Sequence, residues 1–300
     1  MPQRSIAGTL AAAVTPLCET GQRLDEAAFE PLLGFYRQSG IDGLLVLGTT
    51  GEGILLSAQE RRRVAERAVE LAGELRVIVH CGAQTTAETA ALAAHAADCG
   101  ADGVAVIAPP YFGFSAAELL EHFASAAAAC APLAFYVYEY AERSGYAVPV
   151  TVVESLAERA SNLVGMKVSD APFRRLEPYL QIGLDVFVGA EAVIAEGMAA
   201  GAVGAVSGVA AAFPEAVRAA VEDPTPENLT RVISLRTALS ELPFQASVKT
   251  ALGLRGVPVR PDVRAPLLPL SEAEGRRLRT GLERILEGGL EPSGSLSTGA

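Results

Sequence analysis

One lysine in the middle of the chain has the surroundings that amine chemistry requires. Lys167 lies near the end of a short apolar stretch over residues 163–168, and the polar pair Ser169 and Asp170 follows it. This pattern predicts a buried strand that ends just past the lysine. A buried ammonium group is costly unless it is paired or loses its proton, although a lysine at a strand end can also extend its charge into solvent. As a neutral amine, Lys167 would attack a carbonyl carbon and form a Schiff base; Asp170 would oppose this if it turned back as a counter-charge.

Three further groups with hydroxyl chemistry follow predicted strands. Tyr138 ends one strand, the sequence Gly48-Thr49-Thr50-Gly51-Glu52 follows another, and Tyr111 follows a third. A tyrosine can carry protons to and from a carbinolamine. Threonine hydroxyls and backbone N–H groups at a Gly-rich loop can hold the carboxylate of a 2-keto acid. These groups would make a Schiff-base site if the fold placed them on the same face as Lys167.

The elements that must position these groups alternate between strands and helices. Apolar runs predict strands at residues 6–14, 43–47, 76–82, 103–108, 133–138, 163–168, 184–188 and 202–207. Two of the helices between them begin with capping boxes, Ser57 with Glu60 and Ser115 with Glu118. This alternation predicts an α/β fold, a (β/α)₈ barrel, in which all strand ends share one face. A doubly wound open sheet is the alternative, but the first strand–helix turn lacks the G-x-G-x-x-G sequence.

The predicted strands stop after residue 225. Helical patterns follow at residues 226–241, 244–254 and 271–287. We therefore expect a catalytic barrel over residues 1–225 and a C-terminal helical appendage over residues 226–300, with a frayed tail from Gly288.

The composition limits the classes of partner. The chain of 300 residues is 50% hydrophobic and 20% charged, which suits a large folded core, and its net charge of −11 argues against nucleic acid or an anionic membrane. No signal peptide and no long apolar run is visible, so we expect a cytoplasmic protein without membrane contact. The cysteines are scattered and the histidines lack metal-ligand spacing. We therefore expect reduced thiols, no metal and no cofactor; the four cysteines are Cys18, Cys81, Cys99 and Cys130.

The chain resembles the pyruvate-dependent class I aldolases of the dihydrodipicolinate synthase and N-acetylneuraminate lyase family. The resemblance runs from Gly8 to Leu267, and its most specific segments are Gly48-Thr49-Thr50-Gly51-Glu52 and Gly165-Met166-Lys167. It implies pyruvate as one substrate, a small aldehyde or 2-keto acid as the other, no cofactor, and a homotetramer built from tight dimers.

The resemblance also implies a role for each matching residue. Lys167 matches the Schiff-base lysine, Tyr138 the proton-shuttle tyrosine, and Tyr111 a relay tyrosine that reaches the site of the neighbouring subunit. The remaining matches bind substrate or relay protons: Thr49 and Thr50 at the pyruvate carboxylate, Arg143 at a second carboxylate, and Gly189 with the carbonyl of Val206 along the pyruvate pocket.

The chain departs from the family pattern at the shuttle tyrosine. The family usually has Tyr-x-x-Pro there, whereas this chain has Tyr138-Glu139-Tyr140-Ala141. Tyr136, Tyr138 and Tyr140 alternate along one strand, so alternation does not choose among them. Only Tyr138 has the spacing to Arg143 that matches the family.

Two functions follow from these residues, and the sequence leaves the choice between them open. Arg143 favours a synthase that condenses pyruvate with an aldehyde bearing its own carboxylate, because a guanidinium binds a carboxylate through two parallel hydrogen bonds. Sialic acid lyases carry an acidic pair for the sugar polyol where this chain keeps only Glu191. Gly51-Glu52-Gly53 and the segment around Lys167 nevertheless favour an aldolase that cleaves a 2-keto sugar acid to pyruvate, in which Glu191 would contact the polyol. The intact lysine, tyrosine and threonines argue against a third hypothesis, a catalytically inactive binding barrel.

Overall fold

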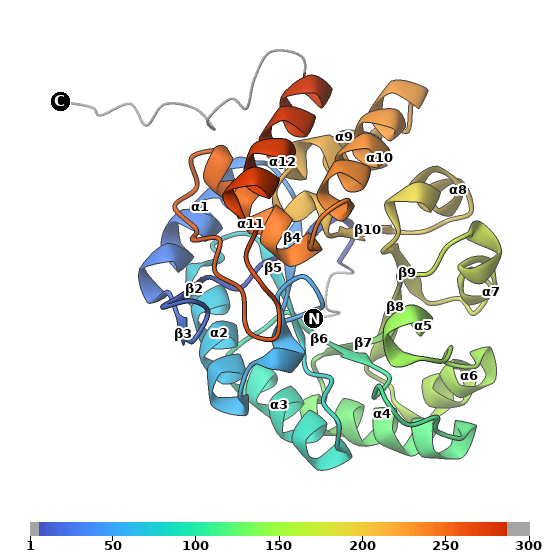
Figure 1. Cartoon of the computed structure of the whole chain (residues 1–300). Helices are drawn as coiled ribbons and strands as arrows, with labels where there is room; N and C mark the ends of the chain where they lie inside the picture. Colours follow the sequence, from blue (N-terminus) through green and yellow to red (C-terminus); the bar gives the residue numbers. More distant parts are fainter. Residues whose placement is uncertain (1–5, 287–300) are drawn as a thin grey trace.

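The computed structural model describes residues 6–286, in which parallel strands close into a barrel (Figure 1). In pairing order the strands are β1 (Gly8–Ala12), β10 (Gly204–Ser207), β9 (Asp185–Val188), β8 (Leu163–Val168), β7 (Ala134–Glu139), β6 (Gly103–Ile107), β5 (Arg76–His80) and β4 (Gly43–Val46). β4 pairs with β1 and completes the circle. The predicted (β/α)₈ barrel is confirmed, and the open sheet was the wrong alternative.

The barrel interior is packed with side chains and leaves space for a ligand only near the strand ends. Tyr136 of β7 lies in an apolar layer with Phe187, their ring centroids 6.1 Å apart. Two glycines make room for this tyrosine, because a Cβ at Gly103 or Gly165 would lie 3.0 Å from its ring. Further along the same pair of strands, β7 and β8 place Tyr138 and Lys167 side by side as register partners.

The helices that follow the strands cover the outside of the barrel. They are α1 (Phe29–Gln38), α2 (Ala58–Leu71), α3 (Thr86–Asp98), α4 (Ala116–Cys130), α6 (Val150–Arg159), α7 (Glu177–Leu180), α8 (Ile194–Ala199) and α9 (Pro214–Glu222). Both predicted capping boxes are present, at the N-termini of α2 and α4. Two small elements were not predicted from the sequence. They are the antiparallel hairpin of β2 (Leu17–Cys18) and β3 (Arg23–Leu24), and the short helix α5 (Ala141–Ser144).

Three more helices follow the barrel at nearly the predicted positions. They are α10 (Pro226–Ser240), α11 (Phe244–Leu254) and α12 (Glu272–Ile285), and Figure 1 shows them grouped beside α9. Each of them contacts the other two. The predicted frayed tail from Gly288 lies outside the described residues. Within residues 6–286, no helix has the length and apolar composition needed to cross a membrane.

Candidate active site

A pocket of about 220 Å³ opens at the carboxyl ends of the barrel strands. Eight of the nine residues predicted from the sequence line it: Thr49, Thr50, Tyr138, Arg143, Lys167, Gly189, Glu191 and Val206. They come from the ends of different strands and from the segments that follow them, as the barrel topology requires. The ninth residue, Tyr111, does not line this pocket.

Lys167 is a buried lysine without an acidic partner. Only 7% of its surface is exposed, and its Nζ lies 4.0 Å from the centroid of the Tyr138 ring. No carboxylate of the described residues forms an ion pair with it, since Asp170 and Glu191 pair with arginines and Glu52 pairs with Lys249. The site therefore offers an amine beside a phenol, which is the arrangement that imine formation needs.

Asp170 is held toward α5, and the departure from the family pattern explains why. Its Oδ2 accepts a hydrogen bond of 3.0 Å from the backbone N–H of Ala141, and its Oδ1 lies 3.9 Å from Arg175. A proline, which the family usually has at the position of Ala141, has no N–H to donate. The loss of the proline thus supplies a donor for Asp170, and this carboxylate does not turn back onto Lys167.

The geometry separates the three tyrosines that alternation could not. Tyr138 is 1% exposed and its Oη lies 3.2 Å from the Oγ1 of Thr49, close enough to pass a proton. Tyr136 belongs to the interior layer below the pocket. Tyr140 lines the pocket and stacks on Tyr138 with ring centroids 6.3 Å apart, but it makes no hydrogen bond to Thr49.

His80 lies behind Tyr138 and is neutral. Its ring meets that of Tyr138 edge-on, with centroids 5.8 Å apart. Burial lowers the pKa of His80 to about 3, and the charge of Arg61 acts in the same direction. Its Nδ1 is 3.0 Å from the carbonyl oxygen of Leu47, which can only accept, so Nδ1 carries the proton. This histidine therefore supports the tyrosine as a rigid neutral ring.

The Gly-Thr-Thr-Gly loop is held in place by α11 of the C-terminal region. Gln245 donates a hydrogen bond of 3.2 Å to the backbone carbonyl of Thr49. One turn further along α11, Lys249 forms an ion pair of 2.5 Å with Glu52, and neither side chain has any exposed surface. Lys249 also donates to the backbone carbonyl of Asp262 at 2.6 Å. The appendage predicted from the sequence is thus in direct contact with the loop that carries Thr49.

The other side of the pocket is shaped by close backbone approach. A Cβ at Gly189 would lie 2.1 Å from the Oγ of Ser169 and 3.0 Å from its Cα, so a larger residue would displace the Ser169 side chain at the ends of β8 and β9. Val206, at the end of β10, is 2% exposed and faces the same pocket. These two positions keep that wall narrow and apolar.

Glu191 lines the pocket, but both of its carboxylate oxygens already contact other groups of the protein. Its Oε1 accepts from the hydroxyl of Ser207 at 2.6 Å and from the backbone N–H of Val209 at 3.2 Å. Its Oε2 lies 3.4 Å from Nη1 of Arg236 on α10. This carboxylate is 3% exposed as a side chain, so little of it is available to a ligand.

Sequence reasoning missed the residues that the C-terminal helices contribute to the pocket. They are Arg236 of α10, and Phe244 and Gln245 of α11. The rule that active-site residues follow barrel strands cannot find them, because they lie on helices beyond the last strand. The helical pattern predicted the helices, but no motif marks which face meets the barrel mouth.

Arg143 and Tyr111 occupy exposed positions. Arg143 lies on α5, with its guanidinium carbon 5.5 Å from the centroid of the Tyr140 ring. Tyr111 is 87% exposed, and Phe112 beside it is 62% exposed, with ring centroids 4.8 Å apart. The φ of Tyr111 is +84°, a left-handed conformation that is unusual for an aromatic residue. A single chain therefore presents these two rings to the outside.

A second, more apolar chamber of about 340 Å³ adjoins the pocket. The two cavities share Thr49, Tyr138, Arg143 and Gln245. The remaining walls of the chamber are mainly apolar: Leu47, Ile54, Leu55, Ile107, Pro110 and Leu267 line it together with His80. The hydrogen bond between Thr49 and Tyr138 therefore faces both cavities.

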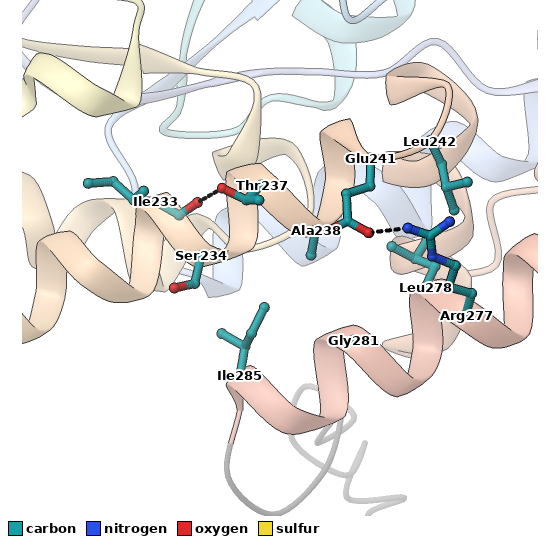
Figure 2. Close-up of a pocket in the computed structure, with 10 residues that line it drawn as sticks. All are labelled: Ile233, Ser234, Thr237, Ala238, Glu241, Leu242, Arg277, Leu278, Gly281 and Ile285. Atoms are coloured by element: carbon teal, nitrogen blue, oxygen red, sulfur yellow. Dashed lines mark hydrogen bonds and ion pairs between the residues drawn. The ribbon is translucent and has the colours of Figure 1, made fainter.

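A separate depression of about 300 Å³ lies between α10 and α12 (Figure 2). Arg277 donates to Glu241 across it at 2.6 Å, and Ile233, Leu278 and Ile285 supply apolar walls. None of the predicted site residues lines it. Among residues 6–286, no group of three or more His, Cys, Asp and Glu side chains is arranged to hold a metal ion.

Comparisons with known proteins identify the family and agree with the fold. The model of the family described as "Dihydrodipicolinate synthetase family" matches residues 5–285. The 4-hydroxy-tetrahydrodipicolinate synthase of Coxiella burnetii is 30% identical over 93% of this chain and 98% of its own. The structure of Proteus mirabilis N-acetylneuraminate lyase superposes with a TM-score of 0.86 at 28% identity, covering 94% of this chain and 99% of that one. YagE of E. coli K12, solved in complex with pyruvate, gives a TM-score of 0.87 at 26% identity, covering 93% of this chain and 98% of that one.

Proposed function

The chain belongs to the dihydrodipicolinate synthetase family, and we propose that it is a Schiff-base-forming lyase that condenses pyruvate with a small aldehyde bearing its own carboxylate. One observation carries the proposal: Lys167 is buried without an acidic partner, 4.0 Å from the ring of Tyr138, whose hydroxyl contacts Thr49. An amine at this place can attack a carbonyl carbon and form a Schiff base.

In the proposed reaction the Lys167 amine adds to C2 of pyruvate, and water leaves to give an imine. Loss of a proton from C3 gives the enamine, whose carbon attacks the aldehyde carbon while the aldehyde oxygen takes up a proton. Water then cleaves the imine, which releases the product and regenerates the lysine. Tyr138 moves the protons, and Thr49 relays them through the contact of 3.2 Å.

The remaining predicted residues hold the substrates in this proposal. Thr49 and Thr50 bind the carboxylate of pyruvate, and Gly189 with the Val206 carbonyl lines its methyl side. Arg143 on α5 receives the carboxylate of the aldehyde, because a guanidinium is the side chain best suited to such a contact. No cofactor takes part.

A second candidate is an aldolase that cleaves a 2-keto sugar acid. The similarity to Proteus mirabilis N-acetylneuraminate lyase supports this candidate. The two reactions share the imine and differ in the second substrate. The contacts of Glu191 with Ser207, Val209 and Arg236 count against a polyol-binding role for this residue. We therefore rank the synthase first.

We also propose that the protein is a cytoplasmic homotetramer built from tight dimers. The exposed Tyr111 and Phe112 would lie in the dimer interface, and the partner's Tyr111 would enter the apolar chamber beside Thr49 and Tyr138. The chamber and the exposed tyrosine support this assembly, and the four free cysteines suit a reducing compartment. Sedimentation should show an assembly; a fully active monomer of 31.1 kDa would contradict the proposal.

The decisive experiment is reduction with borohydride in the presence of pyruvate. The chain has only two lysines, Lys167 and Lys249, so intact-mass and peptide analysis can assign an adduct without ambiguity. We expect one adduct, on Lys167. The absence of any adduct would favour the inactive barrel, and an adduct on Lys249 would show that the assigned nucleophile is wrong. Turnover assays with carboxylated and polyol aldehydes then separate the two lyase functions.

A further inference from the structure

Two guanidinium groups from different parts of the chain line the pocket that contains Lys167. Arg143 lies on α5, directly after β7, and Arg236 lies on α10, beyond the last strand of the barrel. Both of their charges act on the Tyr140 hydroxyl: burial raises its pKa, and Arg143 and Arg236 each oppose that rise. The guanidinium carbon of Arg143 lies 5.5 Å from the centroid of the Tyr140 ring, and Tyr140, Arg143 and Arg236 line the same pocket.

Arg236 is held in position on two sides. Its guanidinium carbon lies 4.4 Å from the centroid of the Phe244 ring, and its Nη1 is 3.4 Å from Glu191. Glu191 is the only ion-pair partner of Arg236 within residues 6–286. The side chain of Arg236 remains 38% exposed, which leaves part of its fork of N–H donors open to the pocket.

Glu191 is better suited to hold Arg236 than to bind a ligand. Its two oxygens already accept from Ser207, from the Val209 N–H and from Arg236. A carboxylate with these contacts holds the guanidinium of Arg236 in place. Few of its lone pairs remain to accept a hydrogen bond from a sugar hydroxyl. This arrangement assigns Glu191 a positioning role instead of the polyol-binding role suggested by its place in the sequence.

The charge of the pocket is opposite to that of the whole protein. Two guanidinium groups, those of Arg143 and Arg236, line it against the single carboxylate of Glu191, while the chain carries a net charge of −11. The pyruvate carboxylate is already assigned to Thr49 and Thr50. Arg143 and Arg236 are thus two further cations at the pocket, available to meet a second anionic group of the ligand.

We propose that Arg236 is a specificity residue that binds, together with Arg143, a carboxylate at the end of the substrate remote from the Schiff base. The substrate class is then a 2-keto acid or aldehyde with a distal carboxylate, and Glu191 acts through Arg236. This inference rests on the proposed function, since it requires an imine at Lys167 to fix the near end of the ligand.

The test compares 2-keto acids that differ only at their far end. The pairs are 2-oxoglutarate with 2-oxopentanoate and, one carbon longer, 2-oxoadipate with 2-oxohexanoate. Each is trapped on Lys167 with borohydride at increasing concentration, and the half-saturating concentrations give a preference ratio within each pair. The ratio cancels any change that affects both acids equally. We expect the dicarboxylate to be preferred about tenfold to a hundredfold in at least one pair.

The variants locate that preference. Arg236→Gln and Arg143→Gln should each reduce the ratio about tenfold or more, and Arg236→Lys should restore little because an ammonium lacks the forked geometry. Arg231→Gln is the matched control: it removes the same charge from an exposed position on α10 and should leave the ratio unchanged. Glu191→Gln should lower the ratio in the wild-type background and add nothing when Arg236 is already glutamine.

The outcomes separate the inference from the function beneath it. If pyruvate itself is not trapped, the proposed function fails. If pyruvate is trapped but neither dicarboxylate is preferred, or if Arg236→Gln leaves the preference intact, this inference is overturned while the Schiff-base function stands. A loss in Glu191→Gln that is confined to polyol 2-keto acids would assign Glu191 to the ligand and overturn the positioning role.

Discussion

The chain contains two lysines, both buried, and their surroundings differ in the one respect that decides their chemistry. Lys249 has no exposed surface, forms an ion pair of 2.5 Å with Glu52, and donates to the carbonyl of Asp262. Lys167 is 7% exposed and lies over the Tyr138 ring, and no carboxylate within residues 6–286 forms an ion pair with it. Burial alone therefore does not distinguish the two lysines; we propose that the one without a carboxylate partner among residues 6–286 is the nucleophile.

The two lysines also differ in what their surroundings favour: a structural ion pair at Lys249 and, as we propose, covalent chemistry at Lys167. Burial lowers the pKa of Lys249, but the charge of Glu52 opposes that effect and favours the ammonium form. This pair joins α11 to the loop that carries Thr49 and Thr50. Lys167 forms no ion pair within residues 6–286, so a covalent bond to its amine would break none. Four predictions test the comparison.

Removal of Lys167 should have the largest effect on activity. Lys167→Met should abolish the borohydride adduct and lower kcat/KM by a factor on the order of 10⁴ or more, because the covalent route is lost. Mass spectrometry and steady-state kinetics measure both quantities. Lys249 should remain unlabelled in the folded protein, and a residual adduct on Lys249 in the variant would remove the distinction between the two sites.

Removal of the phenol beside Lys167 should slow the chemistry without preventing the imine. Tyr138→Phe should reduce kcat by about 10²–10⁴, the usual contribution of a positioned acid–base group. Tyr36→Phe is the matched control, because Tyr36 is also fully buried and its hydroxyl donates to the backbone carbonyl of Ala211. The control should lower stability but not kcat; equal effects on kcat would mean that Tyr138 is structural.

The free energy of unfolding should respond in the opposite order to the activity. Lys249→Met leaves Glu52 buried and unpaired and should cost about 3–5 kcal/mol, whereas Lys167→Met removes an unpaired buried amine and should be neutral or stabilising. Urea unfolding measures both. In the double variant Lys249→Met/Glu52→Gln, part of the loss should be recovered. A larger loss for Lys167→Met would show that the unpaired lysine is the structural one.

Glu139 is a buried acidic group and can be compared with the two buried lysines. Glu139 is 1% exposed, and burial, with a further contribution from Asp170, raises its pKa to about 8. Below the pKa of about 4.5 in the unfolded chain both states are protonated; between that value and about 8 only the folded state holds the proton. Stability from this group is therefore present at low pH and is lost as pH rises toward 8.

The isosteric variant isolates this smaller effect. Glu139→Gln keeps an acceptor for the Val148 N–H, which now donates to Glu139 at 3.0 Å, but it cannot titrate. Between pH 5 and 8 its melting temperature should fall less with pH than that of the wild type. Parallel curves for the two proteins would show that Glu139 is not protonated in the folded state.

The sequence predicted the parts of the site that depend on barrel topology. Lys167 and Tyr138 end adjacent strands, so a correct count of strand–helix units places them together, and the register makes them direct neighbours. Arg236 was missed for the corresponding reason. It lies on a helix after the barrel, and the angle at which a helix packs depends on side-chain fit that a periodic pattern does not encode.

The partner of Asp170 and the place of Tyr111 could not be predicted from the sequence, for a different reason. Whether Asp170 would pair with Lys167 depended on a competing donor, and that donor is a backbone N–H of Ala141, which residue types alone do not locate. The role proposed for Tyr111 requires a second copy of the chain, and a single chain shows only that its side chain is exposed. The sequence could suggest Asp170 from its place after Lys167, and the family pattern could suggest Tyr111, but neither could place the side chain.

The burial of both lysines gives the protein an unusual surface for amine reagents. All the other basic residues among its 24 lysines and arginines are arginine, so no lysine ammonium projects from the described surface. Acylating dyes, crosslinkers and surface-coupling resins that react with lysine would find only Lys167, at the bottom of its pocket, besides an α-amino group. Occupancy of that pocket would then control labelling, and the same scarcity removes the usual acceptors for enzymes that acetylate or ubiquitinate folded proteins.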